Sequence, residues 1–436
     1  MDDISDEVVR FTSELIRIDT TNRGGGDCRE RPAAEYVAAV LSEAGLEPQI
    51  LESAPGRANA VTRLAGQDPS RPGLLVHGHL DVVPADAADW AVHPFSGEVV
   101  EDCVWGRGAI DMKNMVAMML AVARAFAREG RRPGRDVVFA FTADEEDTAA
   151  HGSDWLVRRH ARLFEGCTEA VGESGAYTFH VGDGVRLYPV AAGERGTAWL
   201  ELTARGRAGH GSKVHDDNAV AHLAAAVTRI DAHVWPVQLS PTVRAALVAI
   251  GRAVGVDADP ESPGFDVDVT LERLGRAAAL VRSTVRNSAS PTMLRAGSKV
   301  NVIPGTATAR VDGRVLPGGQ ELFRATLDEL VGPSVRWEYL HQEVPLEAPI
   351  DAPTFIAMRD SLVAEDPSAR VVPVCMSGGT DAKQFSRLGI VGYGFSPVLL
   401  PPGIDYQAMF HGVDERVPVA GLQFGVRVLD RFLSRC

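Results

Sequence analysis

The stretch LLVHGHLDVVP, residues 74–84, is an apolar run that ends in two histidines and an aspartate. Turn formers precede it, and a short apolar run bounded in this way is typical of a buried strand. His79 and Asp81 are two positions apart, so in an extended chain they point to the same side. This arrangement suits a metal-binding imidazole beside a carboxylate that orients it, and it equally suits a structural histidine at a strand end. His77 is as good a candidate ligand as His79 on these residues alone.

Length and composition limit what the chain can be. At 436 residues it exceeds the usual size of one domain, so we expect two. Its formal net charge of -14 argues against a nucleic-acid partner, which would need a basic face. The acidic N-terminus is unlike a signal peptide, and no apolar run is long enough for a membrane span. Five scattered cysteines without a C-x-x-C pair predict a cytoplasmic protein, and any metal would be held by histidine and carboxylate.

Two further predicted strands also end in acids. The run 137–142 leads to Glu145 and Glu146, and the run 170–172 leads to Glu173. Ligands in α/β folds bind beyond the carboxyl ends of parallel strands, so these ends would build one site if they converge. Asp111 precedes a long apolar helix predicted for 112–128, where capping alone could explain an aspartate.

The pattern changes after Gly196. An alternating strand, a glycine-rich turn with His210 and helical patterns near 243–254 and 269–286 follow, and paired strands surround residues 304–305. We therefore expect residues 195–314 to form a small α/β domain inserted into a larger one made of residues 1–194 and 315–436. Alternating helices and strands resume from residue 320.

Seven short motifs occur along the chain in one order. They are H-x-D-V-V-P at 79–84, G-R-G-A-x-D-M-K at 106–113, A-D-E-E at 143–146, G-H-G-S at 209–212, N-V-I-P at 301–304, G-G-T-D at 378–381 and F-H-G-V-D-E at 410–415. In this order the chain resembles the M20 family of metallopeptidases and deacylases, which includes glutamate carboxypeptidase, acetylornithine deacetylase, succinyl-diaminopimelate desuccinylase and aminoacylase. The resemblance covers nearly the whole chain. It implies a three-layer catalytic domain with a mixed, mostly parallel sheet and an inserted lid domain that makes a homodimer.

The resemblance also implies a site for two zinc ions, for which cobalt or manganese could substitute. His79 and Glu173 would bind one ion, His411 and Glu146 the other, and Asp111 would bridge them. Imidazole and carboxylate ligands without thiolate suit catalytic zinc. Three carboxylates against two divalent cations leave about one positive charge, which a bridging hydroxide neutralises. This reading leaves His77 as a strand residue.

Catalytic roles follow from the same resemblance. Glu145 would be the general base that takes a proton from the metal-bridging water, and Asp81 would orient His79. His210 would reach the active site of the partner subunit and stabilise the oxyanion. Candidate substrate contacts are Asn301, Arg314, Gly379 and Thr380.

The expected reaction is hydrolysis of an amide in a small substrate, an N-acyl amino acid or a short peptide with a free carboxylate. A serine hydrolase is disfavoured because no G-x-S-x-G motif occurs, and the glycine runs lack a nucleotide-binding pattern. Alternatives within reach are a dipeptidase, a carbamoyl-amino-acid hydrolase and a non-catalytic binding protein on the same scaffold. The stretch 236–290 is longer than in compact deacylases, and Glu173 stands where some family members have aspartate.

Overall fold

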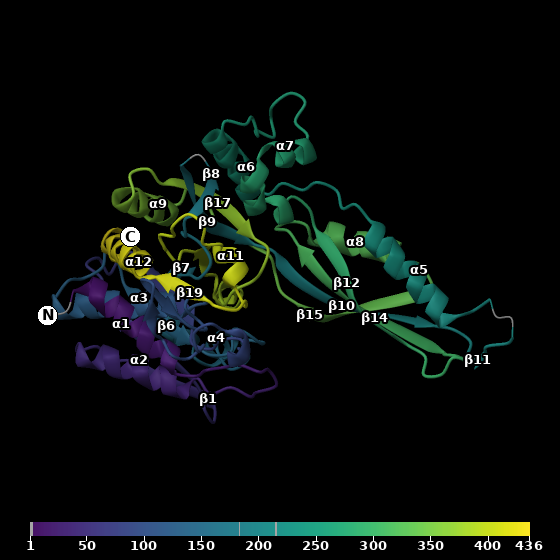
Figure 1. Ribbon diagram of the computed structural model, residues 1–436, viewed down its shortest axis with the longest axis horizontal. Coiled ribbons are helices and arrows are strands. Elements are labelled where there is room, and N and C mark those ends of the chain that lie inside the picture. Colours follow the sequence, from purple (N-terminus) through teal and green to yellow (C-terminus); the bar gives the residue numbers. More distant parts are fainter. Residues whose placement is uncertain (1–2, 183, 214–215) are drawn as a thin grey trace.

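The computed structural model describes residues 3–182, 184–213 and 216–436. The chain forms a large body and an elongated arm that projects from it (Figure 1). We define the arm as residues 196–235 and 288–342, and the inserted segment as residues 236–287, which lie between the two arm stretches in sequence. The remaining described residues make the body.

A mixed sheet of ten strands forms the centre of the body. Its main path runs β1-β2-β6-β3-β7-β18-β9-β16, and β17 and β8 both pair with β9. Strands β6, β3, β7 and β18 are parallel neighbours, so their carboxyl ends share one edge of the sheet. The strands are β1 Gln49–Ala54, β2 Arg57–Leu64, β3 Gly73–His79, β6 Val137–Thr142, β7 Cys167–Gly172, β8 Phe179–Gly182, β9 Val185–Glu194, β16 Leu346–Glu347, β17 Arg370–Met376 and β18 Val391–Gly394.

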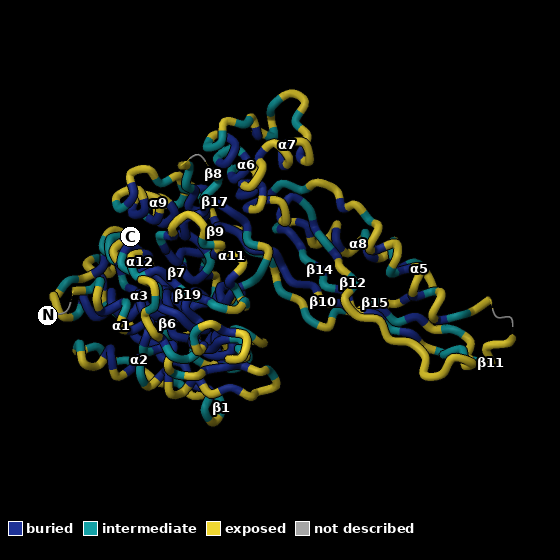
Figure 2. Tube along the Cα trace, in the orientation of Figure 1, coloured by how far each residue is buried: buried dark blue, intermediate teal, exposed yellow. Residues whose placement is uncertain are grey.

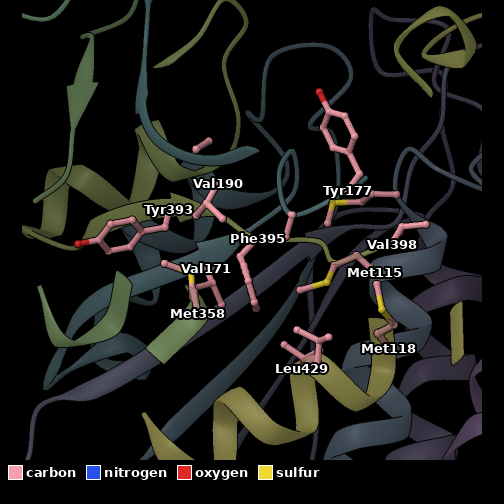
Figure 3. Packing of buried hydrophobic residues seen from close by; sticks show 14 of the residues in the cluster. Met115, Met118, Val171, Tyr177, Val190, Met358, Tyr393, Phe395, Val398 and Leu429 are labelled. Atoms are coloured by element: carbon pink, nitrogen blue, oxygen red, sulfur yellow. The ribbon is translucent and has the colours of Figure 1, made fainter. Parts of the chain in front are cut away.

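Helices cover both faces of this sheet, which gives three layers. Alternate strand residues face opposite sides: Leu74 and Val76 join the main core, and Leu75 joins a smaller cluster on the other face. In Figure 3, Phe395 and Leu429 point into the same part of the main core. The main-core helices are α1 Ile4–Arg17, α2 Arg31–Glu43, α3 Lys113–Arg128, α9 Pro353–Glu365 and α12 Val419–Arg435, and the other face carries α4 Ser153–Arg159 and α10 Ala382–Phe385.

Shorter elements complete the body. Strand β19 pairs with β5, and this pairing brings the chain around residue 415 beside the loop that precedes α3. The short elements are β4 Val99–Val100, β5 Cys103–Trp105, β19 Arg416–Pro418, α11 Tyr406–Met409 and the 3₁₀ turns Ala87–Asp89, Ala161–Phe164 and Ser386–Leu388.

No helix in the described part of the chain is both long and apolar enough to cross a membrane.

The arm is a four-stranded antiparallel sheet with helices on one face and its own apolar core. At its far end, β11 pairs with β13 in a largely exposed tip (Figures 1 and 2). The sheet order is β12-β14-β10-β15. The arm elements are β10 Gly196–Arg205, β11 Gly209–His210, α5 Ala219–Ala232, β12 Ser288–Ala296, β13 Val302–Ile303, β14 Thr306–Val315, α8 Gln320–Val331 and β15 Val335–Gln342.

The packed arm differs from the predicted inserted domain, residues 195–314. It extends through α8 and β15, because Phe323 and Leu327 fill its core and β15 pairs with β10. The inserted segment, in contrast, packs on the body, where Val243 and Leu247 belong to the main core. Its elements are α6 Pro241–Val254, α7 Val267–Arg273 and the 3₁₀ turns Gly275–Leu280 and Arg282–Thr284. The single helix expected over 269–286 is thus broken, at Gly275 with its positive φ of 56°.

Candidate metal centre

Three adjacent strand ends bring the predicted acids and His79 together. His79 ends β3, Glu145 and Glu146 follow β6, and Glu173 follows β7. Because β6 and β7 flank β3 in parallel, these side chains meet at one edge of the sheet. One ligand atom from each of His79, Glu145 and Glu173 lies within 4.8 Å of the other two. The same holds for His79, Asp111 and Glu146.

Asp111 lies between the two histidines. Its Oδ1 is 3.1 Å from Nε2 of His79, and its Oδ2 is 3.3 Å from Nε2 of His411. Each imidazole also faces a second carboxylate: Nε2 of His411 is 3.2 Å from Glu146, and Nε2 of His79 is 3.7 Å from Glu173. The five side chains therefore form two imidazole and carboxylate groups joined by one shared carboxylate.

The Asp111 loop is held by the glutamate that ends the F-H-G-V-D-E motif, a residue to which the motif alone assigned no role. Glu415 is fully buried and accepts hydrogen bonds from the backbone N–H groups of Gly108, Ile110 and Asp111, at 3.0, 2.7 and 3.1 Å. Arg107 donates to the same carboxylate at 2.8 Å. Glu415 thus ties the Asp111 loop to the loop that carries His411.

Asp81 supports the Glu145–Glu146 turn more directly than it supports His79. Its carboxylate accepts from the backbone N–H groups of Glu145 at 3.2 Å and Glu146 at 3.1 Å. Nδ1 of His79 lies 2.9 Å from the backbone oxygen of Asp81 and 3.6 Å from the carboxylate. Asn22, which the sequence analysis missed, donates to Asp81 at 2.9 Å. With Nδ1 directed at a carbonyl, Nε2 of His79 is left to face the acids.

A buried ion-pair network lies behind the same turn. Arg57 donates to Glu30 at 2.7 Å and to Asp144 at 2.5 Å, and all three side chains are almost completely buried. The backbone N–H of Asp144 donates to Glu30 at 3.2 Å. Asp144 adopts a positive φ of 66°, so these contacts fix an uncommon backbone conformation directly before Glu145.

The cluster holds more carboxylates than imidazoles, and this imbalance is reflected in the pKa values of its members. Burial and then the neighbouring Glu173 raise the pKa of Glu145 well above its usual value. Burial raises the pKa of Glu173 to about 8. Hydrogen bonds to Asp111 and Glu146 raise the pKa of His411 to about 10. Crowded buried carboxylates favour protons or cations in this way.

The donor set fits divalent cations. Oε1 of Glu146 is buried and has no hydrogen-bond partner among the described residues. Such an atom beside two imidazoles and further carboxylates is what a cation site requires. His77, the alternative ligand, lies apart: it packs against Phe385, and burial lowers its pKa to about 3. His79 is therefore the histidine of β3 that faces the acids.

A cavity of about 540 Å³ opens onto these residues. Gly379, a predicted substrate contact, lines it. Thr380 does not, since its hydroxyl donates to Glu194 at 2.7 Å. The full lining is Asp111, Glu145, Glu146, Glu173, Ser174, Gly175, Tyr177, Pro189, Ala279, Leu280, Ser283, Thr284, Val374, Cys375, Met376, Ser377, Gly378, Gly379, Gln407, Phe410 and His411.

The predicted site residues of the arm are not among this lining. His210 lies in β11 at the tip, and the adjacent Gly211 donates to the backbone oxygen of Asn301 at 2.9 Å. Arg314 in β14 pairs with Asp312 at 2.8 Å. Within one chain, the acids and histidines of the body come together without these three residues.

Comparison with known proteins identifies the family. The family model of peptidase family M20/M25/M40 matches residues 75–435. The chain belongs to this family. The bovine N-fatty-acyl-amino acid synthase/hydrolase is 26% identical over 92% of this chain and 81% of that protein. Pig aminoacylase-1 is 25% identical over 93% of this chain and 91% of that protein.

Solved M20 structures share the fold. An M20 family metallo-carboxypeptidase from Sulfolobus solfataricus matches with a TM-score of 0.71 and 16% identity, over 100% of this chain and 99% of that one. A Bacillus subtilis protein described as a dinuclear metal binding peptidase matches with a TM-score of 0.63 and 12% identity, over 99% of each chain. The predicted family and α/β fold are confirmed, and this M20 chain is an amide or peptide hydrolase.

Proposed function

We propose that this M20 chain is a two-metal hydrolase of N-acyl amino acids that uses Glu145 as its general base. One observation carries the proposal: the Asp111 carboxylate lies between His79 and His411, and each imidazole faces a further acid. A single carboxylate that presents one oxygen to each half of the site suits a pair of cations.

The residues that would hold the ions are those of the shared cluster. His79 and Glu173 would serve one ion, His411 and Glu146 the other, and Asp111 would serve both. Zinc is the proposed native metal, because nitrogen and oxygen donors without thiolate suit catalytic zinc, and cobalt or manganese could replace it. When bound, such ions polarise the scissile carbonyl and acidify the attacking water.

Glu145 has the position of a proton carrier. It lines the cavity, and one of its carboxylate oxygens lies within 4.8 Å of the ligand atoms of His79 and Glu173. The backbone N–H of Glu145 donates to Asp81, and this hydrogen bond fixes the position from which the Glu145 side chain extends. From this position Glu145 would accept a proton from the attacking water and then transfer it to the leaving amine.

The proposed substrate class rests on relatives and on the cavity. Relatives along most of the chain are named aminoacylase-1 and N-fatty-acyl-amino acid synthase/hydrolase. We place the substrate carboxylate near the Gly379 loop, where backbone N–H groups are available, with Arg314 and Asn301 as further contacts. The partner subunit's His210 would stabilise the oxyanion in a homodimer formed through the arm. The five cysteines are free, which agrees with the proposed cytoplasmic location.

The Glu145→Ala variant tests the mechanism. We expect kcat to fall by about 10²–10⁴-fold, the usual contribution of a general base, while bound metal stays near two ions per chain. Glu165→Ala, which removes an exposed acid outside the cavity, is the matched control and should leave both quantities unchanged. Substantial residual turnover by Glu145→Ala would contradict the assignment.

A peptidase specificity is the second candidate, because human carnosine dipeptidase 1 shares the fold with a TM-score of 0.65. A hydrolysis screen separates the candidates by offering N-acetyl, N-succinyl and N-carbamoyl amino acids and dipeptides to the zinc- or cobalt-loaded chain. Preference for acyl amino acids supports the proposal, and preference for dipeptides or carbamoyl compounds supports the alternatives. A chain with neither bound metal nor hydrolysis would be a binding protein.

A further inference from the structure

The two ends of the inserted segment lie side by side where the segment joins the arm. Val237 and Arg286 form an antiparallel bridge, and the backbone N–H of Gln238 donates to Val285 at 2.9 Å. Both ends of the segment connect to the arm, yet the segment packs against β9 and β17 of the body. The segment therefore lies within the arm in sequence but packs with the body in the folded chain.

Specific contacts fix the segment at its two ends. The backbone N–H of Thr242 donates to Glu347 at 2.9 Å, at the start of α6. Arg195 donates to the backbone oxygen of Ser283 at 2.8 Å, in the last 3₁₀ turn. Leu271 and Val281 are almost fully buried in the main core. These contacts give the turns at 275–284 a defined place beside the cavity.

The turns form one wall of that cavity. Ala279, Leu280, Ser283 and Thr284 line it together with residues from the end of β17. Its charged lining is confined to four acids and His411, and no lysine or arginine occurs among the described residues that line it. Away from the acids the lining is therefore neutral and largely apolar.

We infer that the 275–284 wall determines substrate specificity by accepting an uncharged hydrocarbon substituent and disfavouring a second negative charge. The inference rests on the proposed function and names the substrate class of the same site. A hydrocarbon group loses water favourably against Leu280 and its apolar neighbours. An additional carboxylate would lose water without a lysine or arginine in the lining to pair with. The hydrocarbon belongs either to the acyl chain or to the amino-acid side chain.

Ala279 offers a test that spares the core, because its side chain is exposed and lines the cavity. In Ala279→Phe, the new ring should lower kcat/KM for large hydrocarbon substituents by at least about tenfold relative to small ones, since single methylenes already discriminate by such factors. One substrate series lengthens the acyl group from acetyl to decanoyl on a single amino acid. The other enlarges the side chain from alanine to phenylalanine on acetyl substrates. The series in which kcat/KM falls more for the larger substrates than for the smaller ones identifies the group that contacts the wall.

A charge variant tests the second half of the inference. Ala279→Lys supplies the missing cation, so we expect kcat/KM for N-succinyl or N-acetyl-glutamate substrates to rise at least about tenfold relative to neutral counterparts. Ala364→Phe and Ala364→Lys, at an exposed alanine of α9 outside the cavity, are the matched controls and should change neither ratio.

Three results overturn the inference. Equal losses for every substrate in Ala279→Phe, or no change for any, would show that the wall does not select. An unchanged preference in Ala279→Lys would remove the charge argument. If the wild-type chain hydrolyses none of these amides, the proposed function fails and the inference fails with it. A wild-type chain that is active and variants that keep its selectivity contradict the inference alone.

Discussion

The body and the tip of the arm hold residues of the proposed site in opposite environments. In the body, Asp81 and Glu415 are fully buried and hold the backbones of the metal-site loops through several hydrogen bonds. At the tip, His210 is exposed, and its ring contacts Ser212 two residues away at 2.9 Å. One chain therefore supplies a pre-organised set of candidate metal donors, and the residues proposed to contact the substrate's carbonyl lie elsewhere. The comparison indicates that folding of one chain fixes the first part of the proposed site, whereas the second part would have to be supplied by the arm of a partner subunit.

Among changes that leave Glu145 and the candidate metal donors intact, the largest effect should come from the arm residue. We expect His210→Ala to lower kcat by about 10²–10³-fold, as loss of an oxyanion donor does elsewhere, with metal content unchanged. Steady-state kinetics and metal analysis on the same preparation measure both. The equivalent change at the exposed His93 of the body is the control, because this residue does not line the cavity.

Mixing variants tests whether His210 acts across a dimer. His210→Ala and Glu145→Ala chains are each defective, but a mixed dimer would hold one complete site. After unfolding and refolding a 1:1 mixture, activity should return to about a quarter of wild type, because half of randomly paired dimers are mixed. A mixture no more active than its components would place His210 outside the partner's site.

A smaller effect is expected in the body from Asp81→Asn. The amide keeps the size of Asp81 but replaces one carboxylate oxygen with an N–H₂ group, so one of the backbone N–H groups of Glu145 and Glu146 loses its acceptor. Metal affinity should fall by about 10–100-fold, as it does when groups that orient ligands are changed. Competition with a chromophoric chelator measures this, and Asp68→Asn on an exposed loop is the control. Unchanged affinity in Asp81→Asn would show that the turn keeps its position without this carboxylate.

The smallest effect concerns the junction of body and arm, where Glu194 accepts hydrogen bonds from Thr380. Burial raises its pKa from 4.5 to about 7, so between these values the folded state holds a proton that the unfolded state releases. Unfolding free energy from this group therefore decreases as pH rises through that window, by at most about 1.4 kcal/mol per pH unit. Glu194→Gln removes the titration, and its unfolding free energy should decline less steeply in urea denaturation at pH 5, 6 and 7. Parallel profiles for variant and wild type would contradict this.

Local sequence was sufficient for the strand ends of the site. An apolar run followed by His79, Glu145 or Glu173 predicts both the strand and the polar edge, because the two signals are adjacent in sequence. Partners such as Asn22 and Glu415 were missed, since hydrogen bonds between distant segments leave no local pattern. Whether they meet depends on the packing of the whole sheet.

The inserted segment shows the same limit at the level of the fold. Its helix over 243–254 was predicted close to the observed α6, because the apolar residues have helical spacing. The spacing of apolar residues indicates that one face of the helix is buried, but it does not indicate which part of the molecule covers that face. The segment was therefore assigned to the arm by its position in sequence, whereas Val243 and Leu247 pack in the main core of the body.

The route of the inserted segment also constrains synthesis of the protein. Helix α6 leaves the ribosome before β17, its main partner, which begins only at Arg370. Until then its apolar face, including Val243 and Ile250, has only part of its final packing surface, and the arm on either side of it is still incomplete. Nascent chains exposed in this way are prone to aggregation and chaperone binding. Slow expression or low temperature should therefore improve the yield of active protein, and truncation before residue 370 should leave an insoluble fragment.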